Sequence, residues 1–149
     1  MIPLVGNVKE IKLQRDLVER IVEAVLKENR LAKKEIPYMI ATMIEVPRAA
    51  VTADEIVREA ELLSFGTNDL TQMGWGFSRD DSGKFLKEYV VLGICEKEPF
   101  RVLDQGGVGK LAAMACELGR KTRLTIKLGI CGNPASIHFR HRVGLNYVS

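Results

Sequence analysis

The 149-residue sequence has few of the features that mark membrane, secreted or nucleic-acid-binding proteins. Its apolar runs are much shorter than the roughly 20 residues that a membrane-spanning helix needs. The opening MIPLVGNVKE has no basic region that leads into a long apolar stretch, so we do not expect a signal peptide. The net charge is only +3, and basic residues are spread along the chain instead of clustering. We therefore expect neither a membrane nor a nucleic acid as partner.

Cysteine is also scarce. The chain has three cysteines, Cys95, Cys116 and Cys131, and they form no CxxC pair. An odd number without that spacing argues against a disulfide framework and against a structural zinc site. The simplest compartment is a reducing one, the cytoplasm or an organelle matrix, and we do not expect secretion.

The residues that are present suit one globular domain over 1–149, because 46% are hydrophobic and 28% are charged. Short apolar runs, typical of buried strands, alternate with segments of helical periodicity. We expect strands at 1–5, 38–46, 62–66 and 125–131 and the start of another at 144–149, with helices at 8–30, 52–63, 84–90, 107–119 and 133–143. This alternation predicts an α/β fold built on a parallel sheet.

Polar side chains follow three of these predicted strands. Glu45 ends the second strand, Asn68 and Asp69 follow the third in SFGTNDLTQM, and Cys131 ends the fourth. The carboxyl ends of parallel strands meet at one edge, where ligands bind in α/β folds and in TIM barrels. We therefore expect Asn68 and Asp69 to lie beside Glu45.

The residues alone leave the roles of these side chains open. Glu45 and Asp69 suit Mg²⁺, which prefers oxygen ligands, but a helix cap and an Asx turn explain them slightly better. Arg79 in GFSRDD suits a phosphate, although a lone arginine more often pairs with a neighbour such as Asp80 or Asp81. Cys131 ends a strand at a Gly-flanked turn, and from the residues alone it is clearly better explained as a small buried residue.

Two apparent motifs do not hold. A Walker P-loop in DQGGVGKL requires Gly at position 104 and Ser or Thr at position 111, where the chain has Asp104 and Leu111. These glycines are better interpreted as the start of a helix. His138 and His141 have no Cys or carboxylate to complete a metal site, so we expect surface histidines.

Several long segments, in this order, resemble the carboxyl-terminal PEP/pyruvate-binding domain of the pyruvate, phosphate dikinase family. They are MIPLVGNVKE, TMIEVPRAAVTADEI, SFGTNDLTQMGWGFSRDDSGKF, LDQGGVGKL and GICG, followed by PASIHFRHRVGLNYVS. GTNDLTQ is shared with phosphoenolpyruvate synthase and with enzyme I of the sugar phosphotransferase system, whereas GFSRDD and LDQGGVGKL favour the dikinase.

The resemblance implies a (β/α)₈ TIM barrel that binds pyruvate or phosphoenolpyruvate with Mg²⁺. Glu45 and Asp69 match metal ligands, and Cys131 matches the acid/base that moves a proton at the methyl carbon. The remaining matches to substrate-binding residues are Gly66, Thr67, Asn68 and Arg79, with Glu45 and Asp69 also near the substrate. In the complete enzyme, a swinging phosphohistidine domain links this barrel to an ATP-grasp domain. The overall reaction turns ATP, phosphate and pyruvate into AMP, diphosphate and phosphoenolpyruvate.

The sequence departs from the family in two respects. A Glu-His-Gly-Gly-Asp-Pro type loop is expected after GICG, but CGNPAS follows directly, which shortens the wall next to Cys131. A TIM barrel takes about 250 residues, so we expect a partial barrel that begins near its middle and stops in its last strand. The ATP-grasp and phosphohistidine domains are absent from the sequence.

We therefore expect the isolated chain to be inactive in the full reaction, and to partner the remainder of a dikinase or itself. Two alternatives remain. One is a non-catalytic interaction or regulatory fragment, and the other is a part of phosphoenolpyruvate synthase or of enzyme I.

Overall fold

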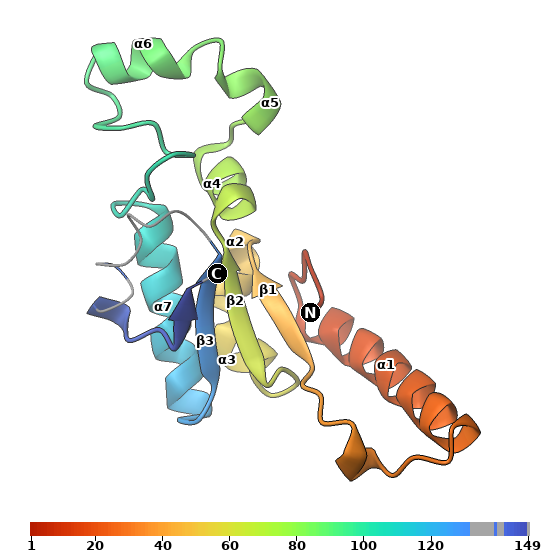
Figure 1. The fold of residues 1–149 in the computed structure, drawn as a ribbon. Helices are drawn as coiled ribbons and strands as arrows, with labels where there is room; N and C mark the ends of the chain where they lie inside the picture. Colours follow the sequence, from red (N-terminus) through yellow and green to blue (C-terminus); the bar gives the residue numbers. More distant parts are fainter. Residues whose placement is uncertain (132–138, 140–141, 149) are drawn as a thin grey trace.

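The computed structural model describes residues 1–131, 139 and 142–148. A four-stranded parallel sheet in the order β1-β2-β3-β4 forms its centre (Figure 1). The strands are β1 (Ala41–Ile44), β2 (Leu62–Gly66), β3 (Lys127–Cys131) and β4 (Tyr147–Val148). The predicted α/β class with a parallel sheet is confirmed, whereas a partial (β/α)₈ barrel stays a prediction.

The expected strand at 1–5 is reduced to one isolated bridge between Ile2 and Thr42. The Ile2 N–H donates to Ala41 O over 2.8 Å, and the Met43 N–H donates to Ile2 O over 2.9 Å. The ladder stops there because the Leu4 N–H, the next group that could bond to β1, donates to Glu45 Oε1 instead over 2.8 Å. Leu4 then turns the chain away with a φ of 53°.

Three helices lie together on one side of the sheet: α2 (Pro47–Val51), α3 (Ala53–Ile56) and α7 (Val108–Thr122) (Figure 1). Helix α7 contacts both α2 and α3. Alternate strand residues complete the core that these helices share, with Ile44, Phe65 and Ile130 fully buried. The sheet thus has a fixed orientation, because a slip by one residue would turn these side chains to the other face.

The helix expected at 52–63 is present as α3, which has Thr52 as its N-cap residue but ends at Ile56. A separate helix, α2, precedes it and begins at Pro47, where a proline suits the first helical turn. The Thr52 hydroxyl does not cap α3. It donates instead to Arg48 O over 2.9 Å at the end of α2. The capping-box pattern at Thr52 and Glu55 thus marked the correct start of α3, but without the side-chain capping bond that it implied.

Helix α1 (Val8–Glu28) agrees with the predicted helix over 8–30. Asn7 and Glu10 form a capping box at its start, and Ile11 and Leu26 are buried. A second apolar row on α1 is exposed in the described chain, consisting of Leu13, Leu17, Ile21 and Val25. A short 3₁₀ helix, η1 (Lys33–Glu35), lies in the connection from α1 to β1.

The segment between β2 and α7 is more helical than expected. It contains α4 (Thr67–Trp75), α5 (Arg79–Ser82) and α6 (Leu86–Val91), and Figure 1 shows α5 and α6 lying away from the sheet. Helix α6 overlaps the short helix predicted at 84–90 and ends one residue later, and α7 extends three residues beyond the helix predicted at 107–119. No helix was expected directly after Gly66, whereas α4 begins at Thr67 immediately after β2.

The helix expected at 133–143 lies largely outside the described residues, as do His138 and His141. The strand expected from Gly144 is present as β4, which pairs in parallel with β3. In the described part of the chain, we find no helix with the length and apolar character needed to cross a bilayer.

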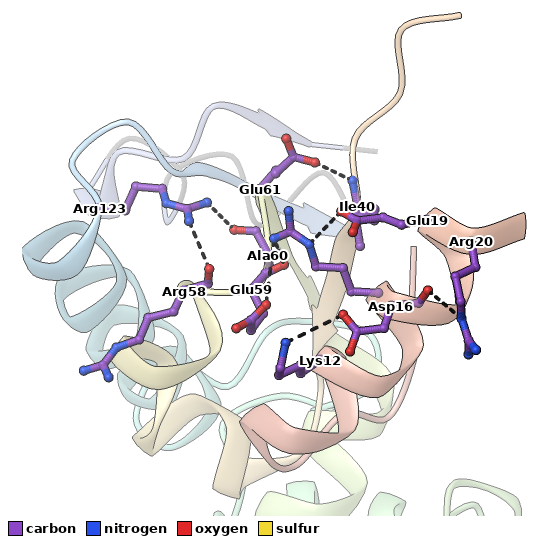
Figure 2. A network of polar contacts seen from close by, with 11 residues as sticks. Lys12, Asp16, Glu19, Arg20, Ile40, Arg58, Glu59, Ala60, Glu61 and Arg123 are labelled. Atoms are coloured by element: carbon purple, nitrogen blue, oxygen red, sulfur yellow. Dashed lines mark hydrogen bonds and ion pairs between the residues drawn. The ribbon is translucent and has the colours of Figure 1, made fainter. Parts of the chain in front are cut away.

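The amino ends of the strands are joined by a network of polar contacts (Figure 2). The Arg123 guanidinium donates to Ala60 O over 2.7 Å and to Arg58 O over 3.2 Å. The Ile40 N–H donates to the Glu61 carboxylate over 2.7 Å. These contacts tie the segments that lead into β1, β2 and β3 to one another.

Candidate functional site

The site is built on the carboxyl edge of the sheet. The parallel register pairs Ile44 with Phe65, and Gly66 with Cys131. Glu45, one residue after Ile44, is therefore level with Gly66 and Cys131 on the three neighbouring strands. Neighbouring residues on a strand point to opposite faces of the sheet. Because Ile44 and Ile130 face the helix-covered core, Glu45 and Cys131 point to the other face.

Glu45 is a buried carboxylate, with only 2% of its surface exposed. Its Oε1 accepts a hydrogen bond of 2.8 Å from the Leu4 N–H. Burial raises the pKa of Glu45, the Leu4 N–H lowers it, and the neighbouring Asp69 carboxylate raises it further. The surroundings of Glu45 thus disfavour its ionised form. Perturbed pKa values of this kind are common at functional sites.

Gly66 leaves the space in which the Glu45 side chain lies. A Cβ atom at position 66 would stand 2.8 Å from Glu45 Cβ and would overlap Glu45 Oε2. The φ of Gly66 is −87°, which any residue can adopt. Glycine is therefore required here by space and not by backbone conformation.

The first turn of α4 contains Thr67, Asn68 and Asp69. The Thr67 hydroxyl donates to Cys131 O over 3.0 Å, which joins the start of α4 to the end of β3. Asn68 is exposed, whereas Asp69 is half-buried beside Glu45. Asp69 is the acidic residue of this first turn, where the helix dipole favours negative charge.

Arg79 is the first residue of α5 and is exposed. Its backbone N–H donates to Gln72 Oε1 over 2.7 Å. The suggested pairing partner Asp81 instead contacts Lys84, with 2.6 Å between Nζ and Oδ1. The structure thus brings Glu45, Gly66 and Asp69 into contact, while Arg79 is linked to them through Gln72.

The three cysteines differ in accessibility: Cys131 is exposed, whereas Cys95 and Cys116 are buried. Burial raises the pKa of Cys116 to about 12, and burial followed by the Asp104 charge raises the pKa of Cys95. Cys131 is therefore the thiol that a solvent molecule can reach. The segment after it, where the shortened loop was expected, lies outside the described residues.

The paired carboxylates of Glu45 and Asp69 fit a small divalent cation. Ionised carboxylates are acceptor-only groups, and a hard cation such as Mg²⁺ takes one or two of them and keeps several waters. Among the described residues, no group of three or more His, Cys, Asp or Glu side chains could hold a metal. A site with two carboxylates and bound waters agrees with magnesium better than with zinc.

Two important side chains were missed from the sequence. The Asp104 carboxylate accepts from the N–H groups of Gly106 and Gly107 over 3.0 and 3.1 Å and from the Trp75 indole over 3.0 Å. The Asp104 carboxylate thus satisfies backbone N–H groups at the start of α7. Gln72 is the second, and its spacing from Asp69 by one helical turn was the available signal.

These strand-end carboxylates, the helix that follows them and the exposed thiol agree with one class of protein. A family model described as "PEP-utilising enzyme, PEP-binding domain" matches residues 1–149. The chain therefore belongs to the PEP-utilising enzymes, in their PEP-binding domain.

The relatives within this class are more specific. Pyruvate, phosphate dikinase of Clostridium symbiosum is 56% identical over 153 residues, covering 100% of this chain and 17% of the relative. The chloroplastic pyruvate, phosphate dikinase 1 of Arabidopsis thaliana is 50% identical, with 100% and 16% covered. The enzyme of Giardia intestinalis is also 50% identical, with 100% and 17% covered. The chain thus corresponds to a small part of each curated relative.

Proposed function

We propose that this chain forms the part of a pyruvate, phosphate dikinase that binds pyruvate or phosphoenolpyruvate. The observation that carries the proposal is the buried Glu45 carboxylate against Asp69 at the carboxyl edge of a parallel sheet. Burying like charges together is costly unless a cation neutralises them. The 50–56% identity to dikinases supports the same conclusion.

In this proposal, Glu45 and Asp69 hold Mg²⁺ and thereby face the oxygens of the substrate. When bound, the ion supplies positive charge that stabilises an enolate oxygen. Gly66 keeps space for the Glu45 carboxylate, and Thr67 holds the end of β3 through Cys131 O. Asn68 is exposed in the same helical turn, where its amide can bind a substrate oxygen.

Cys131 is the proposed acid/base. As a thiolate it takes a proton from the methyl carbon of pyruvate, and the electron pair left behind forms the enolate. The enolate oxygen then accepts a phosphoryl group from a phosphohistidine, which becomes neutral histidine. In the opposite direction the Cys131 thiol returns its proton to carbon. Arg79 is the proposed contact for the phosphoryl oxygens, since its exposed guanidinium begins α5.

We further propose that the 149 residues do not run the overall dikinase reaction alone. That reaction needs ATP binding and a phosphohistidine, and the resemblance assigns neither to this segment. Synthesis of phosphoenolpyruvate from ATP, phosphate and pyruvate by the pure chain would disprove this part of the proposal.

The test is a thermal unfolding curve with and without Mg²⁺ plus oxalate, which mimics the enolate. A ligand at 100 times its dissociation constant stabilises the fold by about 2.7 kcal/mol. We expect this stabilisation in the wild-type chain and in Asp80→Asn, a matched change of an exposed aspartate. We expect none in Asp69→Asn, which keeps the shape of the side chain and removes its charge.

A second function is favoured by the exposed apolar row of α1, formed by Leu13, Leu17, Ile21 and Val25. A non-catalytic chain that associates with a dikinase or with itself would use such a row. It predicts a cooperative melt that Mg²⁺ and oxalate do not move, together with oligomers that persist in Asp69→Asn. Ligand stabilisation that depends on Asp69 favours the first function instead.

A further inference from the structure

Gln72 lies within α4, about one helical turn after Asp69, and its side chain makes two hydrogen bonds. Its Nε2 donates to Asp69 Oδ1 over 3.0 Å. Its Oε1 accepts from the Arg79 N–H over 2.7 Å. One amide therefore contacts both the carboxylate beside Glu45 and the first residue of α5.

The direction of both bonds is determined by chemistry. The Arg79 backbone N–H can only donate, so it selects the oxygen of the Gln72 amide. The NH₂ group is then left facing Asp69, whose carboxylate can only accept when it is ionised. The two contacts are thus mutually consistent, and a side chain with acceptors alone could not satisfy both.

The bond to Arg79 supplies a helix cap that the sequence does not provide locally. The first N–H groups of a helix have no acceptor inside it. Ser78 precedes α5, yet its side chain makes no capping bond. The Gln72 backbone also contributes, because Gln72 O accepts from the Gly76 and Phe77 N–H groups. Gln72 therefore holds the whole connection from α4 to α5.

The bond to Asp69 acts on a carboxylate that lies beside another carboxylate. Asp69, in the first turn of α4, is next to Glu45, which follows the end of β1. Two carboxylates that are both ionised repel each other. The Gln72 NH₂ group restrains one carboxylate oxygen, so that the carboxylate remains beside Glu45.

We propose that Gln72 is a positioning residue that keeps the Asp69 carboxylate next to Glu45 and couples it to the start of α5 at Arg79. The inference rests on the proposed function, in which Asp69 binds Mg²⁺ and Arg79 contacts phosphoryl oxygens. It extends that function, because the ligand of the metal and the basic residue then respond to substrate as one unit.

The experiment uses Gln72→Met, which retains the length and helix propensity of the side chain and removes both hydrogen bonds. Gln14→Met, on the exposed surface of α1, is the matched control. The Mg²⁺ affinity at saturating oxalate is measured by calorimetry. We expect it to weaken by roughly 10- to 100-fold in Gln72→Met, as for other residues that orient metal ligands, and to be unchanged in Gln14→Met.

Hydrogen exchange of the Arg79 amide is the second readout, and it does not require a metal. We expect this amide to be protected in the wild-type chain and to exchange faster in Gln72→Met. Adding Mg²⁺ and oxalate to the wild-type chain should slow its exchange further, which a purely structural role of Gln72 would not produce.

The outcomes separate the two claims. If the wild-type chain binds Mg²⁺ and oxalate and Gln72→Met binds within twofold of it, the role of Gln72 is disproved and the proposed function stands. A wild-type chain that binds no Mg²⁺ with oxalate disproves the proposed function and the inference with it. Should Gln72→Met fail to fold, a wild-type Arg79 amide that exchanges as fast as a free amide still overturns the inference.

Discussion

At the amino ends of the strands, the Arg123 guanidinium donates to the carbonyls of Ala60 and Arg58, whereas at the carboxyl ends the Glu45 carboxylate faces Asp69. The first arrangement places a cation on backbone acceptors and satisfies both. The second places like charges together, with burial that raises the pKa of Glu45. The same strands thus connect one end where a charged donor meets acceptors to another where two carboxylates meet.

This difference separates stability from function within one sheet. Polar groups that only stabilise the fold are paired with partners inside the chain, as the contacts in Figure 2 are. A group that binds an external cation must leave its charge uncompensated in the free chain. The carboxyl edge accordingly sacrifices some stability, which a bound ion would restore.

The largest effect is expected from Gly66→Ala, because the added methyl group would overlap the Glu45 carboxylate. We expect a loss of about 3 kcal/mol in the free energy of unfolding, at the upper end of overpacking costs. The stabilisation by Mg²⁺ and oxalate should also disappear, since Glu45 must move. Denaturant unfolding with and without ligand measures both.

Gly83→Ala is the control for this change, because a Cβ there meets no heavy atom within 4 Å. It should leave both the stability and the ligand response near wild type. A Gly66→Ala chain that keeps the full response would show that the Glu45 carboxylate is not constrained by this glycine.

The next effect is expected at the opposite end of the sheet, from Arg123→Ala. Loss of a charged donor to Ala60 O and Arg58 O should cost about 2 kcal/mol of unfolding free energy. The response to Mg²⁺ and oxalate should be unchanged, because no contact of Arg123 reaches the carboxyl edge. Arg20→Ala, on exposed helix surface, should cost less than about 0.5 kcal/mol.

A gain of stability is expected from Glu45→Gln at neutral pH. The glutamine oxygen can accept from the Leu4 N–H, and its NH₂ group can donate to Asp69, so that the repulsion is replaced by a hydrogen bond. We expect the metal-free chain to gain about 1 kcal/mol, a common size for such a change, and to lose its response to Mg²⁺. Thermal melts of the two chains without metal make the comparison.

The difference in stability between Glu45→Gln and the wild-type chain should depend on pH, and its direction follows from the pKa of Glu45. The folded pKa of Glu45 is raised above its unfolded value, so its contribution to stability is present in full below the unfolded pKa. It is lost as the pH rises through the folded pKa. The advantage of Glu45→Gln should therefore grow from acidic to neutral pH, and a constant advantage would argue against a raised pKa.

The smallest effect on the fold is expected from alkylation. Iodoacetamide should modify the exposed Cys131 and leave the buried Cys95 and Cys116 unmodified in the folded chain. The pKa of Cys116, raised by burial to about 12, leaves almost no thiolate at neutral pH. Mass spectrometry of the labelled peptides identifies the modified thiol, and labelling that spares Cys131 would contradict its exposure.

Much of the fold could be predicted from local patterns. The alternation of apolar runs with helical periodicity predicted β1 to β3 and helices α1 and α7, because each pattern reflects one buried face. Thr52 correctly marked the start of α3, although its hydroxyl donates to Arg48 O instead of capping that helix. Helix α4 was not expected directly after Gly66, because polar residues in succession are as typical of a loop as of a helix start.

The candidate site could be predicted only in part. Glu45 and Asp69 were expected to lie together, since strand ends of a parallel sheet share an edge. Gln72 was missed because its importance depends on the Arg79 N–H, which only the return of the chain through Gly76 brings near. Asp104 was missed for the same reason, because its bond to Trp75 spans 29 positions of sequence.

The sequence by itself determined the parallel α/β arrangement and the set of polar residues at the strand ends, because both depend on periodicity and on residue type within short windows. The tertiary structure alone decided that Glu45 is buried against Asp69, that Gly66 must lack a side chain, and that Gln72 joins α4 to α5. These are consequences of distances between segments remote in sequence. Burial and the pKa of a carboxylate depend on those distances and not on the neighbours of the residue along the chain.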